Sequence, residues 1–280
     1  MLRHEQLIGA NFSFQHHPFR WAAEQLRQMG FKRMELWGIA PHLDLFHDSR
    51  SRLAEVKSIL EDNQLTVHCF TPEQVLYPMN IASGDKAYRE KSVERFLLAA
   101  DICAELQGRY LFLTPGRGFE CESREHAWAN STESVRKIAS HAKRLGIACL
   151  LEPLQRTESN IVNNADELSA FWREIDADNV DVVLDFVAMA TAKDDVAGYV
   201  DRFGKRLSHV HIVDGTPAGH LVWGDGNLPL HDYLAELDAS SFAGTLTFEP
   251  FGSGSYALDP VSAWQRSLKA IAPLLDHADQ

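Results

Sequence analysis

Eight short apolar segments alternate with longer amphipathic ones along this 280-residue chain, and this alternation limits its possible folds more than any other feature. The apolar segments are LIGANFSF, RMELWG, LTVHCF, RYLFLTP, IACLLEP, VDVVLDF, LSHVHIVD and GTLTFEP. If each is a strand, the strands end near residues 14, 35, 70, 114, 152, 185, 211 and 249. Their spacing averages roughly 35 residues, the length of one βα unit. Strands that alternate with helices predict parallel βαβ units.

The segments between these strands carry the signals of helices. PFRWAAEQLRQMG opens at Pro18 and closes at Gly30, where these residue types favour helix ends. Residues 85–108 show the helical apolar period and stop at Gly108. Eight such units predict an α/β fold, a single (β/α)8 TIM barrel, with residues 1–280 as one domain. An open doubly wound sheet is the competing fold, but QHHPFR follows the first strand where that fold needs a glycine-rich phosphate turn.

Composition excludes several classes of protein. The net charge of −12 argues against a nucleic-acid partner, which requires a basic surface. The sequence MLRHEQLIGANFSF lacks the apolar core of a signal peptide, and no apolar run is long enough to span a membrane. The four scattered cysteines form no CxxC pair, which predicts reduced thiols in a cytoplasmic protein.

Ligand-type side chains stand at the ends of the last four predicted strands: Glu152, Asp185, His211 and Glu249. In a barrel of this kind, the C-terminal ends of the strands build the active site. Glu152 is the most informative of the four. It follows two buried leucines, and Pro153 directly after it ends the strand pairing. Because an unpaired buried charge is costly, this strand ends in a way that presents an acid.

Three carboxylates and one imidazole at one rim predict a metal site. Crowded carboxylates repel one another, and a divalent cation removes that repulsion. An oxygen-rich set with one imidazole suits Mn²⁺ or Mg²⁺ better than structural Zn²⁺. We therefore expect one divalent ion, Mn²⁺ first, with Mg²⁺, Co²⁺ or Ni²⁺ as alternatives. Taken singly, each of these residues has an ordinary alternative role as a cap, a loop acid or a core histidine.

Three further residues are candidates near this centre. His209 points to the same face of its strand as His211, and we expect a hydrogen-bonded interior residue there rather than a direct ligand. Glu158 lies in the loop over the barrel mouth, where it either contacts the substrate or is a solvated acid. His220 precedes the turn WGDGNLP and is either a substrate contact or a structural loop residue.

Residues after the second and third strands extend the predicted substrate site. Trp37 and His42 follow the second strand, and Glu73 and Tyr77 follow the third. We expect these side chains to line the rim near the far end of the substrate. Packing of the loops against one another is the alternative role.

These motifs carry a family resemblance. LLEP with Glu158, LD at 184–185, HVHIVD and FEPF resemble the signature of the xylose-isomerase-like superfamily of sugar isomerases and epimerases. MELWGIAPH, TPEQVLYPMN, LEPLQRTESNIVNNADEL and HLVWGDGNLPL resemble its fructoselysine 3-epimerase group in particular, alongside ketose 3-epimerases of the tagatose/psicose type. The resemblance extends over nearly the whole chain. The four metal positions are typical of the superfamily and do not specify one substrate.

The resemblance implies a function. It implies a metal-dependent enzyme that epimerises a ketose or ketosamine at C3 through an enediolate, and it implies dimers or tetramers. Glu152 and Glu249 would be the acid and base, while Asp185 and His211 would hold the ion. Two positions depart from the tagatose/psicose pattern, because Ala188 and Pro217 replace a substrate-binding histidine and arginine. This departure favours a substrate other than a simple free ketohexose.

Three other functions are alternatives. An aldose–ketose isomerase acting on a small sugar, hydroxypyruvate or a sugar phosphate could use the same site, and Arg117 and Arg156 are the nearby basic residues for a phosphate. A metal-dependent phosphodiesterase or endonuclease needs many more histidines at the strand ends and a basic face, so we rank it lower. A regulator without catalytic activity would be expected to lose Glu152 or Glu249, and both are present.

Overall fold

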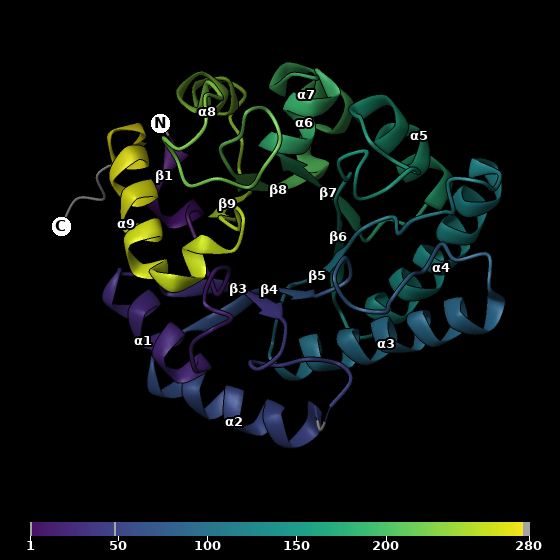
Figure 1. Ribbon diagram of the computed structural model, residues 1–280, viewed down its shortest axis with the longest axis horizontal. Coiled ribbons are helices and arrows are strands. Elements are labelled where there is room, and N and C mark those ends of the chain that lie inside the picture. The colour runs from purple at the N-terminus through teal and green to yellow at the C-terminus, as the bar shows by residue number, and fades with distance from the viewer. Residues whose placement is uncertain (1, 48, 277–280) are drawn as a thin grey trace.

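The computed structural model describes residues 2–47 and 49–276 and shows eight parallel strands ringed by helices (Figure 1). The strands lie in sequential order, and the backbone N–H of Ile8 donates to Leu246 O at 2.9 Å, so the last strand lies beside the first. The barrel is therefore nearly closed, and the predicted TIM-barrel fold is confirmed. Its strands are β2 (Gly9–Ala10), β3 (Arg33–Gly38), β4 (Thr66–Pro72), β5 (Tyr110–Leu113), β6 (Ala148–Leu151), β7 (Val180–Asp185), β8 (Leu207–Ile212) and β9 (Thr245–Phe248).

The helices form the outer layer of the molecule, and the chain passes once around the ring (Figure 1). They are α1 (Phe19–Gln28), α2 (Ser49–Asp62), α3 (Lys86–Glu105), α4 (Arg124–Arg144), α5 (Ala165–Ile175), α6 (Phe186–Ala192), α7 (Val196–Phe203), α8 (Leu230–Ala239) and α9 (Pro260–Ile271). Outside the barrel, β1 (Leu2–Arg3) pairs in parallel with β10 (Leu275–Asp276). Within the part of the chain that the structure describes, no helix has both the length and the apolar character needed to cross a bilayer. The assignment of residues 1–280 to one domain stays a prediction.

Short polar side chains start several of these helices. The carboxylate of Asp85 accepts a hydrogen bond from the backbone of Tyr88 at 3.1 Å at the start of α3. Asp259 caps α9 in the same way through Ser262 at 3.2 Å, with a proline at the first helical position. Each cap satisfies a backbone N–H that has no partner within its helix.

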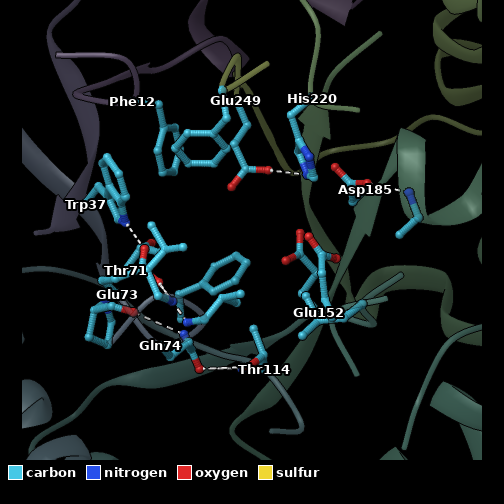
Figure 2. Close-up of a pocket in the computed structure, with 18 of the residues that line it drawn as sticks. Phe12, Trp37, Thr71, Glu73, Gln74, Thr114, Glu152, Asp185, His220 and Glu249 are labelled. Atoms are coloured by element: carbon cyan, nitrogen blue, oxygen red, sulfur yellow. Dashed lines mark hydrogen bonds and ion pairs between the residues drawn. The ribbon is translucent and has the colours of Figure 1, made fainter. Parts of the chain in front are cut away.

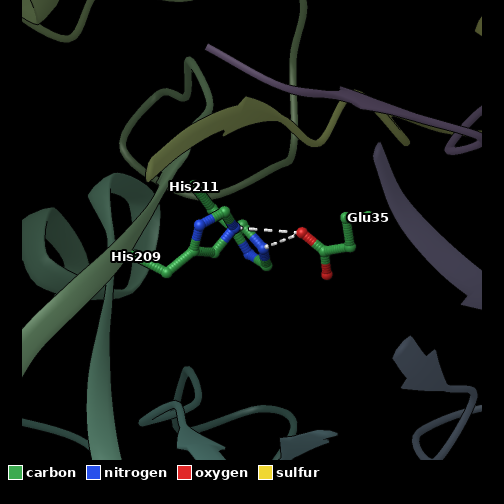
Figure 3. A group of neighbouring side chains, drawn as sticks. All are labelled: Glu35, His209 and His211. Atoms are coloured by element: carbon green, nitrogen blue, oxygen red, sulfur yellow. Dashed lines mark hydrogen bonds and ion pairs between the residues drawn. The ribbon is translucent and has the colours of Figure 1, made fainter. Parts of the chain in front are cut away.

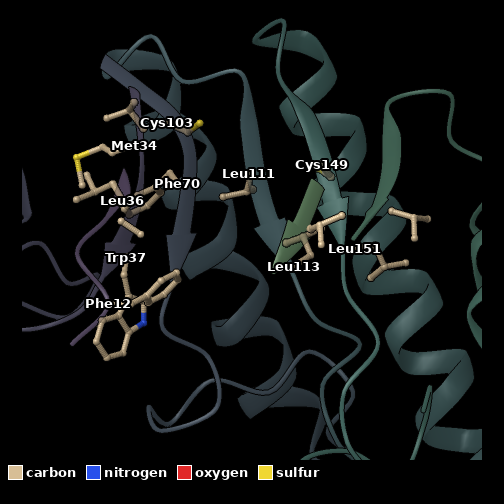
Figure 4. Packing of buried hydrophobic residues seen from close by; sticks show 14 of the residues in the cluster. Phe12, Met34, Leu36, Trp37, Phe70, Cys103, Leu111, Leu113, Cys149 and Leu151 are labelled. Atoms are coloured by element: carbon tan, nitrogen blue, oxygen red, sulfur yellow. The ribbon is translucent and has the colours of Figure 1, made fainter. Parts of the chain in front are cut away.

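The two-residue period of the strands divides the core into an outer and an inner layer. In β5, Leu111 and Leu113 point outward and pack in the main core with residues such as Leu151 of β6 (Figure 4). The alternate residues point into the barrel, where a second cluster comprises Cys69, Tyr110, Phe112, Leu150 and Val183. The barrel is thus filled by side chains, and the residues that follow these inner positions reach its open end.

The first barrel strand is shorter than predicted. β2 ends at Ala10, whereas the sequence predicts a strand end near Phe14. The side chain of Asn11 accepts a hydrogen bond from the backbone N–H of Trp37 at 2.6 Å and donates to the Trp37 carbonyl at 3.0 Å. Ser13 then adopts a left-handed φ of 70°. Side-chain hydrogen bonds therefore replace the strand ladder, and the chain turns before Phe14.

The second and third strands also extend beyond the ends that the sequence predicts. β3 continues to Gly38, so Glu35 lies within the strand and is completely buried. A single acid in an apolar segment resembles a strand end in the sequence, but Leu36 and Trp37 continue the pairing with β4. Similarly, β4 runs to Pro72 rather than ending at Phe70.

Candidate active site

The four predicted metal ligands meet at the C-terminal ends of β6 to β9. Asp185 is the last residue of β7, His211 lies in β8, and Glu152 and Glu249 come directly after β6 and β9. One ligand atom from each lies within 4.8 Å of those of the other three. The strand period explains this convergence, because each ligand stands two residues beyond another residue of its strand on the same face: Leu150, Val183, His209 and Thr247.

Three ligand atoms in this cluster have no hydrogen-bond partner among the described residues. They are Glu152 Oε1, Asp185 Oδ2 and His211 Nδ1, and all are buried. The Nδ1 atom lies 2.9 Å from Glu152 Oε1 and 3.2 Å from Glu249 Oε2 without hydrogen-bond geometry. Buried polar atoms are rarely left without a partner. Three carboxylates and one imidazole nitrogen that converge in this way fit a divalent cation of the Mn²⁺ or Mg²⁺ type.

The electrostatic interactions within the cluster favour the binding of positive charge. Burial raises the pKa of Glu152 well above its usual range, and the pKa of Asp185 is raised for the same reason. Burial lowers the pKa of His211, but Glu249, Glu35 and Glu152 together raise it well above its ordinary value. Protons therefore compensate the excess negative charge of the metal-free site, and a divalent ion would displace them.

The ring of His211 is fixed on two sides. Phe112 stacks on it with 5.2 Å between ring centroids and an interplanar angle of 8°. The Nε2 atom lies 3.2 Å from Glu35 Oε2, on the opposite side of the ring from Nδ1. The second nitrogen therefore has its own partner, and Nδ1 is left to the cluster.

A cavity of about 450 Å³ opens beside this cluster (Figure 2). The rings of Phe12, Trp37 and Phe251 contact one another at the cavity lining. The carboxylates of Glu152 and Asp185 lie across the cavity from Trp37 (Figure 2). Among the described residues, no lysine or arginine lines the cavity. The site thus combines an apolar wall with a strongly acidic one.

Two of the predicted substrate contacts face this cavity close to the cluster. His220 lines the cavity, and its Nε2 lies 3.5 Å from Glu249 Oε2. Glu158 also lines the cavity, and its Oε2 accepts a hydrogen bond from the backbone of Gln155 at 3.1 Å. Burial raises the pKa of Glu158. Both side chains are placed where a bound molecule could contact them.

Trp37 and Glu73 also line the cavity, but their side chains are hydrogen-bonded to each other. The indole N–H of Trp37 donates to Glu73 Oε2 at 2.8 Å. The other oxygen of Glu73 accepts the backbone N–H groups of Val75 and Leu76 at 2.7 and 2.6 Å. Glu73 therefore holds the Trp37 ring and the loop after β4 in place, and its oxygens already have partners.

The structure places neither His42 nor Tyr77 among the residues that line the cavity, and a substrate contact at His42 stays a prediction. His42 is completely buried, with Nδ1 2.8 Å from Asn11 Nδ2 and Nε2 2.8 Å from His17 O. Burial lowers the pKa of His42 to about 4. The hydroxyl of Tyr77 accepts the backbone N–H of Ala40 at 2.7 Å and links two loops. Both residues pack loops, which was the alternative role.

Several cavity residues were not predicted from the sequence. Polar side chains at the cavity wall that were missed are Gln15, Thr71, Gln74 and Thr114. Gln74 Oε1 accepts hydrogen bonds from the backbone and hydroxyl of Thr114 at 2.9 and 3.0 Å, a contact between two separate loops. No local pattern in the sequence predicts that such residues line a cavity. Glu35 did have a signal, because a lone acid within an apolar strand requires buried partners.

The two arginines considered as phosphate ligands lie away from the cavity. Arg156 forms a bidentate pair with Glu120 at 2.9 and 2.6 Å. Arg117 bonds the same carboxylate at 3.1 Å and the carbonyl of Thr157 at 2.7 Å. Neither lines the cavity, so their charges are directed to surface partners.

Comparisons with known proteins show what this chain is similar to. The chain is 27% identical to the fructoselysine 3-epimerase of Escherichia coli O157:H7 over 83% of this chain and 84% of that protein. It is 26% identical to the D-psicose 3-epimerase of Ruminiclostridium cellulolyticum over 83% and 78% of the two chains. The solved structure of an L-ribulose 3-epimerase superposes with a TM-score of 0.77 at 25% identity, covering 98% of this chain and 94% of that one. Residues 23–274 match the xylose isomerase-like TIM barrel family, and the chain belongs to that family.

Proposed function

We propose that this protein is a metal-dependent 3-epimerase of a ketose or ketosamine. The observation that carries the proposal is the convergence of three buried ligand atoms without hydrogen-bond partners, Glu152 Oε1, Asp185 Oδ2 and His211 Nδ1, beside an acidic cavity. The relatives described above are named 3-epimerases of ketoses or of fructoselysine, which supports the same reaction class. Mn²⁺ is the first candidate for the ion.

The residues that would hold the ion are Glu152, Asp185, His211 and Glu249. When bound, a divalent ion would lower the free energy of negative charge on the substrate's carbonyl oxygen. Glu152 and Glu249 come from strands that are separated by β7 and β8, so they reach the cavity from different directions (Figure 2). This separation would allow one carboxylate to lie on each face of the substrate carbon that is epimerised.

The proton transfers follow from this arrangement. One of the two carboxylates removes the proton from C3 of a 2-ketose, and the electron pair of the C–H bond forms the C2–C3 double bond of an enediolate. The carboxyl group of the other residue then donates a proton to the opposite face of C3, while the carbonyl forms again. The substrate is neither oxidised nor reduced, and proton exchange with water returns the two carboxyl groups to their starting states.

The charge of the cavity favours an uncharged or cationic substrate. Within the described residues, its lining contains Glu73, Glu152, Glu158, Asp185 and Glu249 and no lysine or arginine. A sugar phosphate would bring at least one more negative charge to this wall. An aldose–ketose isomerase on a sugar phosphate therefore ranks second. A phosphodiesterase ranks lower, because the four-residue cluster offers a single imidazole.

The experiment that tests the function is turnover in D₂O, followed by NMR. Metal-loaded protein is offered free ketoses, fructosamines and ketose phosphates separately. We expect epimerisation of an uncharged or amine-bearing ketose with deuterium incorporated at C3. Glu152→Gln and Glu249→Gln are expected to lose the reaction, and Glu133→Gln on the exposed face of α4 serves as the matched control. Turnover without deuterium at C3, or near-full activity in either active-site variant, would refute the proposal. The homo-oligomeric state and cytoplasmic location stay predictions from the sequence.

A further inference from the structure

A buried carboxylate lies behind the metal ligand His211, on the side away from the cavity. Glu35 of β3 is completely buried, and its Oε2 lies 3.0 Å from His209 Nε2 and 3.2 Å from His211 Nε2 (Figure 3). Its other oxygen, Oε1, accepts a hydrogen bond from the hydroxyl of Thr71. Three strands, β3, β4 and β8, therefore contribute to this contact.

The chemistry of the partners assigns the hydrogens. An ionised carboxylate only accepts hydrogen bonds, so the Nε2 atoms of both histidines must carry hydrogens. As a carboxylate, Glu35 accepts one hydrogen bond from each of the two rings at Oε2 and a third from the Thr71 hydroxyl at Oε1. In the neutral form that binds a metal ion, a histidine with its hydrogen on Nε2 has its lone pair on Nδ1.

Contacts on the far side of His209 agree with this assignment. Its Nδ1 lies 2.7 Å from the hydroxyl of Thr245, which lies 3.2 Å from Nε2 of His68. Arg33 lies 3.4 Å from His68 Nδ1 and can only donate. Because Arg33 donates, these hydrogen bonds run in one direction: His68 donates to Thr245, Thr245 to His209, and His209 to Glu35. This series of hydrogen bonds therefore places the hydrogen of His209 on Nε2, which faces Glu35.

We propose that Glu35 is a positioning residue for the metal centre. By accepting the Nε2–H of His211, it holds that ring with the Nδ1 lone pair directed at Glu152 and Glu249. Glu35 does not line the cavity, so it acts through His211 and does not touch the substrate. The inference rests on the proposed function, because it presupposes an ion at the four-residue cluster.

A second metal ion between Glu35, His209 and His211 is the competing explanation. The ligand atoms of these three residues also lie within 4.8 Å of one another. The two clusters differ in one respect. The facing atoms of this group are hydrogen-bonded to each other, whereas the first cluster contains three buried atoms without partners. This difference assigns the ion to the first cluster and the hydrogen bonds to the second.

Binding of Mn²⁺ alone to the metal-free protein, followed by calorimetry, tests the inference. Glu35→Leu removes the acceptor, and we expect the dissociation constant for Mn²⁺ to rise by about 10–100-fold. Glu35→Gln keeps a neutral acceptor and is expected to lose about tenfold or less. Gln6→Leu is the matched control, since the Gln6 side chain is also buried but bonds the backbone of Arg3, Phe242 and Gly244, away from His211. Its dissociation constant should stay within about threefold of the wild-type value, even if the protein is less stable.

A second measurement reports the hydrogen bond itself. In protein loaded with diamagnetic Mg²⁺, the Nε2–H proton of His211 should give a downfield, slowly exchanging NMR signal that is absent from His211→Asn. We expect this signal to move upfield in Glu35→Gln. This variant tests the hydrogen bond even if Glu35→Leu does not fold.

The outcomes separate the two proposals. Absence of Mn²⁺ binding by the wild-type protein would overturn the metal centre and this inference with it. Wild-type binding that is unaltered in the Glu35 variants, with an unmoved Nε2–H signal, would overturn this inference alone. Two Mn²⁺ ions per chain, one of them lost in Glu35→Gln, would also overturn it, because His211 Nε2 would then be a ligand rather than a donor.

Discussion

At the scale of single residues, the two nitrogens of His211 have different partners. Nε2 lies against Glu35, and Nδ1 lies 2.9 Å from Glu152 Oε1 without a hydrogen bond. A similar division holds for Asp185, whose Oδ1 accepts the backbone N–H of Ala188 at 2.5 Å while Oδ2 has no partner among the described residues. In each residue one atom fixes the side chain, and the other remains available to an ion.

The division within Asp185 leads to a prediction for Asp185→Asn. An asparagine keeps the oxygen that caps α6 but replaces the second oxygen by an amide nitrogen, which does not bind metal. We expect the Mn²⁺ dissociation constant to rise more than about tenfold, since a charged ligand is lost. Circular dichroism should show an unchanged helix content. Unchanged Mn²⁺ affinity in this variant would remove Asp185 from the set of ligands.

At the scale of elements, one acid organises the long loop between β8 and α8. The buried carboxylate of Asp214 accepts four backbone N–H groups at 2.8–3.1 Å, from Gly215, Gly224, Gly226 and Leu228. The loop packs so tightly that a Cβ at position 226 would lie 2.3 Å from Asp214 Oδ1. His220 is carried by this loop, so its place at the cavity depends on Asp214.

We predict that Asp214→Ala releases this loop. Four backbone donors lose their acceptor, and we expect a loss of roughly 2–3 kcal/mol in the free energy of unfolding. Hydrogen exchange over residues 214–228 should become faster, and KM should rise while Mn²⁺ affinity stays unchanged. Asp214→Asn keeps one oxygen, so its free energy of unfolding and its exchange rates should lie between those of the wild-type protein and Asp214→Ala. Unaltered exchange in Asp214→Ala would contradict this role.

The loop after β3 gives a pH-dependent prediction. Burial lowers the pKa of His42 to about 4 in the folded protein, whereas an unfolded histidine titrates near 6.5. Below about pH 6.5 the unfolded chain therefore binds a proton that folded His42 does not bind until about pH 4. This residue destabilises the fold as the pH falls through that window, by up to about 1.4 kcal/mol per pH unit.

Urea unfolding of the metal-free protein between pH 7 and pH 4 measures this contribution. His42→Gln removes the titrating group, while its amide can still donate and accept. The free energy of unfolding should therefore fall less steeply with decreasing pH in this variant than in the wild-type protein. Parallel curves would show that His42 does not set the acid sensitivity.

The sequence predicted the parts of this structure that local patterns determine. The convergence of Glu152, Asp185, His211 and Glu249 could be predicted, because each stands two residues beyond another residue on the inward face of its strand, as Glu152 does after Leu150. Glu35 was placed at a strand end, since its partners His209 and His211 are far away in the sequence. His42 was assigned to the cavity, although its contacts with Asn11 and His17 depend on how two loops fold together. Long-range hydrogen bonds between loops leave no periodic signal.

At the scale of the whole molecule, the candidate ion joins four consecutive strands. Its ligands come from β6, β7, β8 and β9, about half of the barrel wall. An ion that binds only the folded chain stabilises it by mass action. The net charge of −12 also makes the metal-free barrel a favourable partner for cations.

We predict that Mn²⁺ raises the melting temperature of the protein. At a free concentration of 100 times the dissociation constant, the gain is about 2.7 kcal/mol. Differential scanning calorimetry across a Mn²⁺ titration should show a progressive increase for the wild-type protein and a much smaller one for Asp185→Asn at the same concentrations. Equal increases in both proteins would mean that Mn²⁺ binds elsewhere.

The most direct test of the central claim is anomalous X-ray diffraction from crystals of the protein grown with Mn²⁺. We expect one strong anomalous peak per chain, bounded by Glu152, Asp185, His211 and Glu249, with His211 Nδ1 as the nitrogen ligand. No peak at this position, or a single peak between Glu35 and His209 instead, would contradict the account.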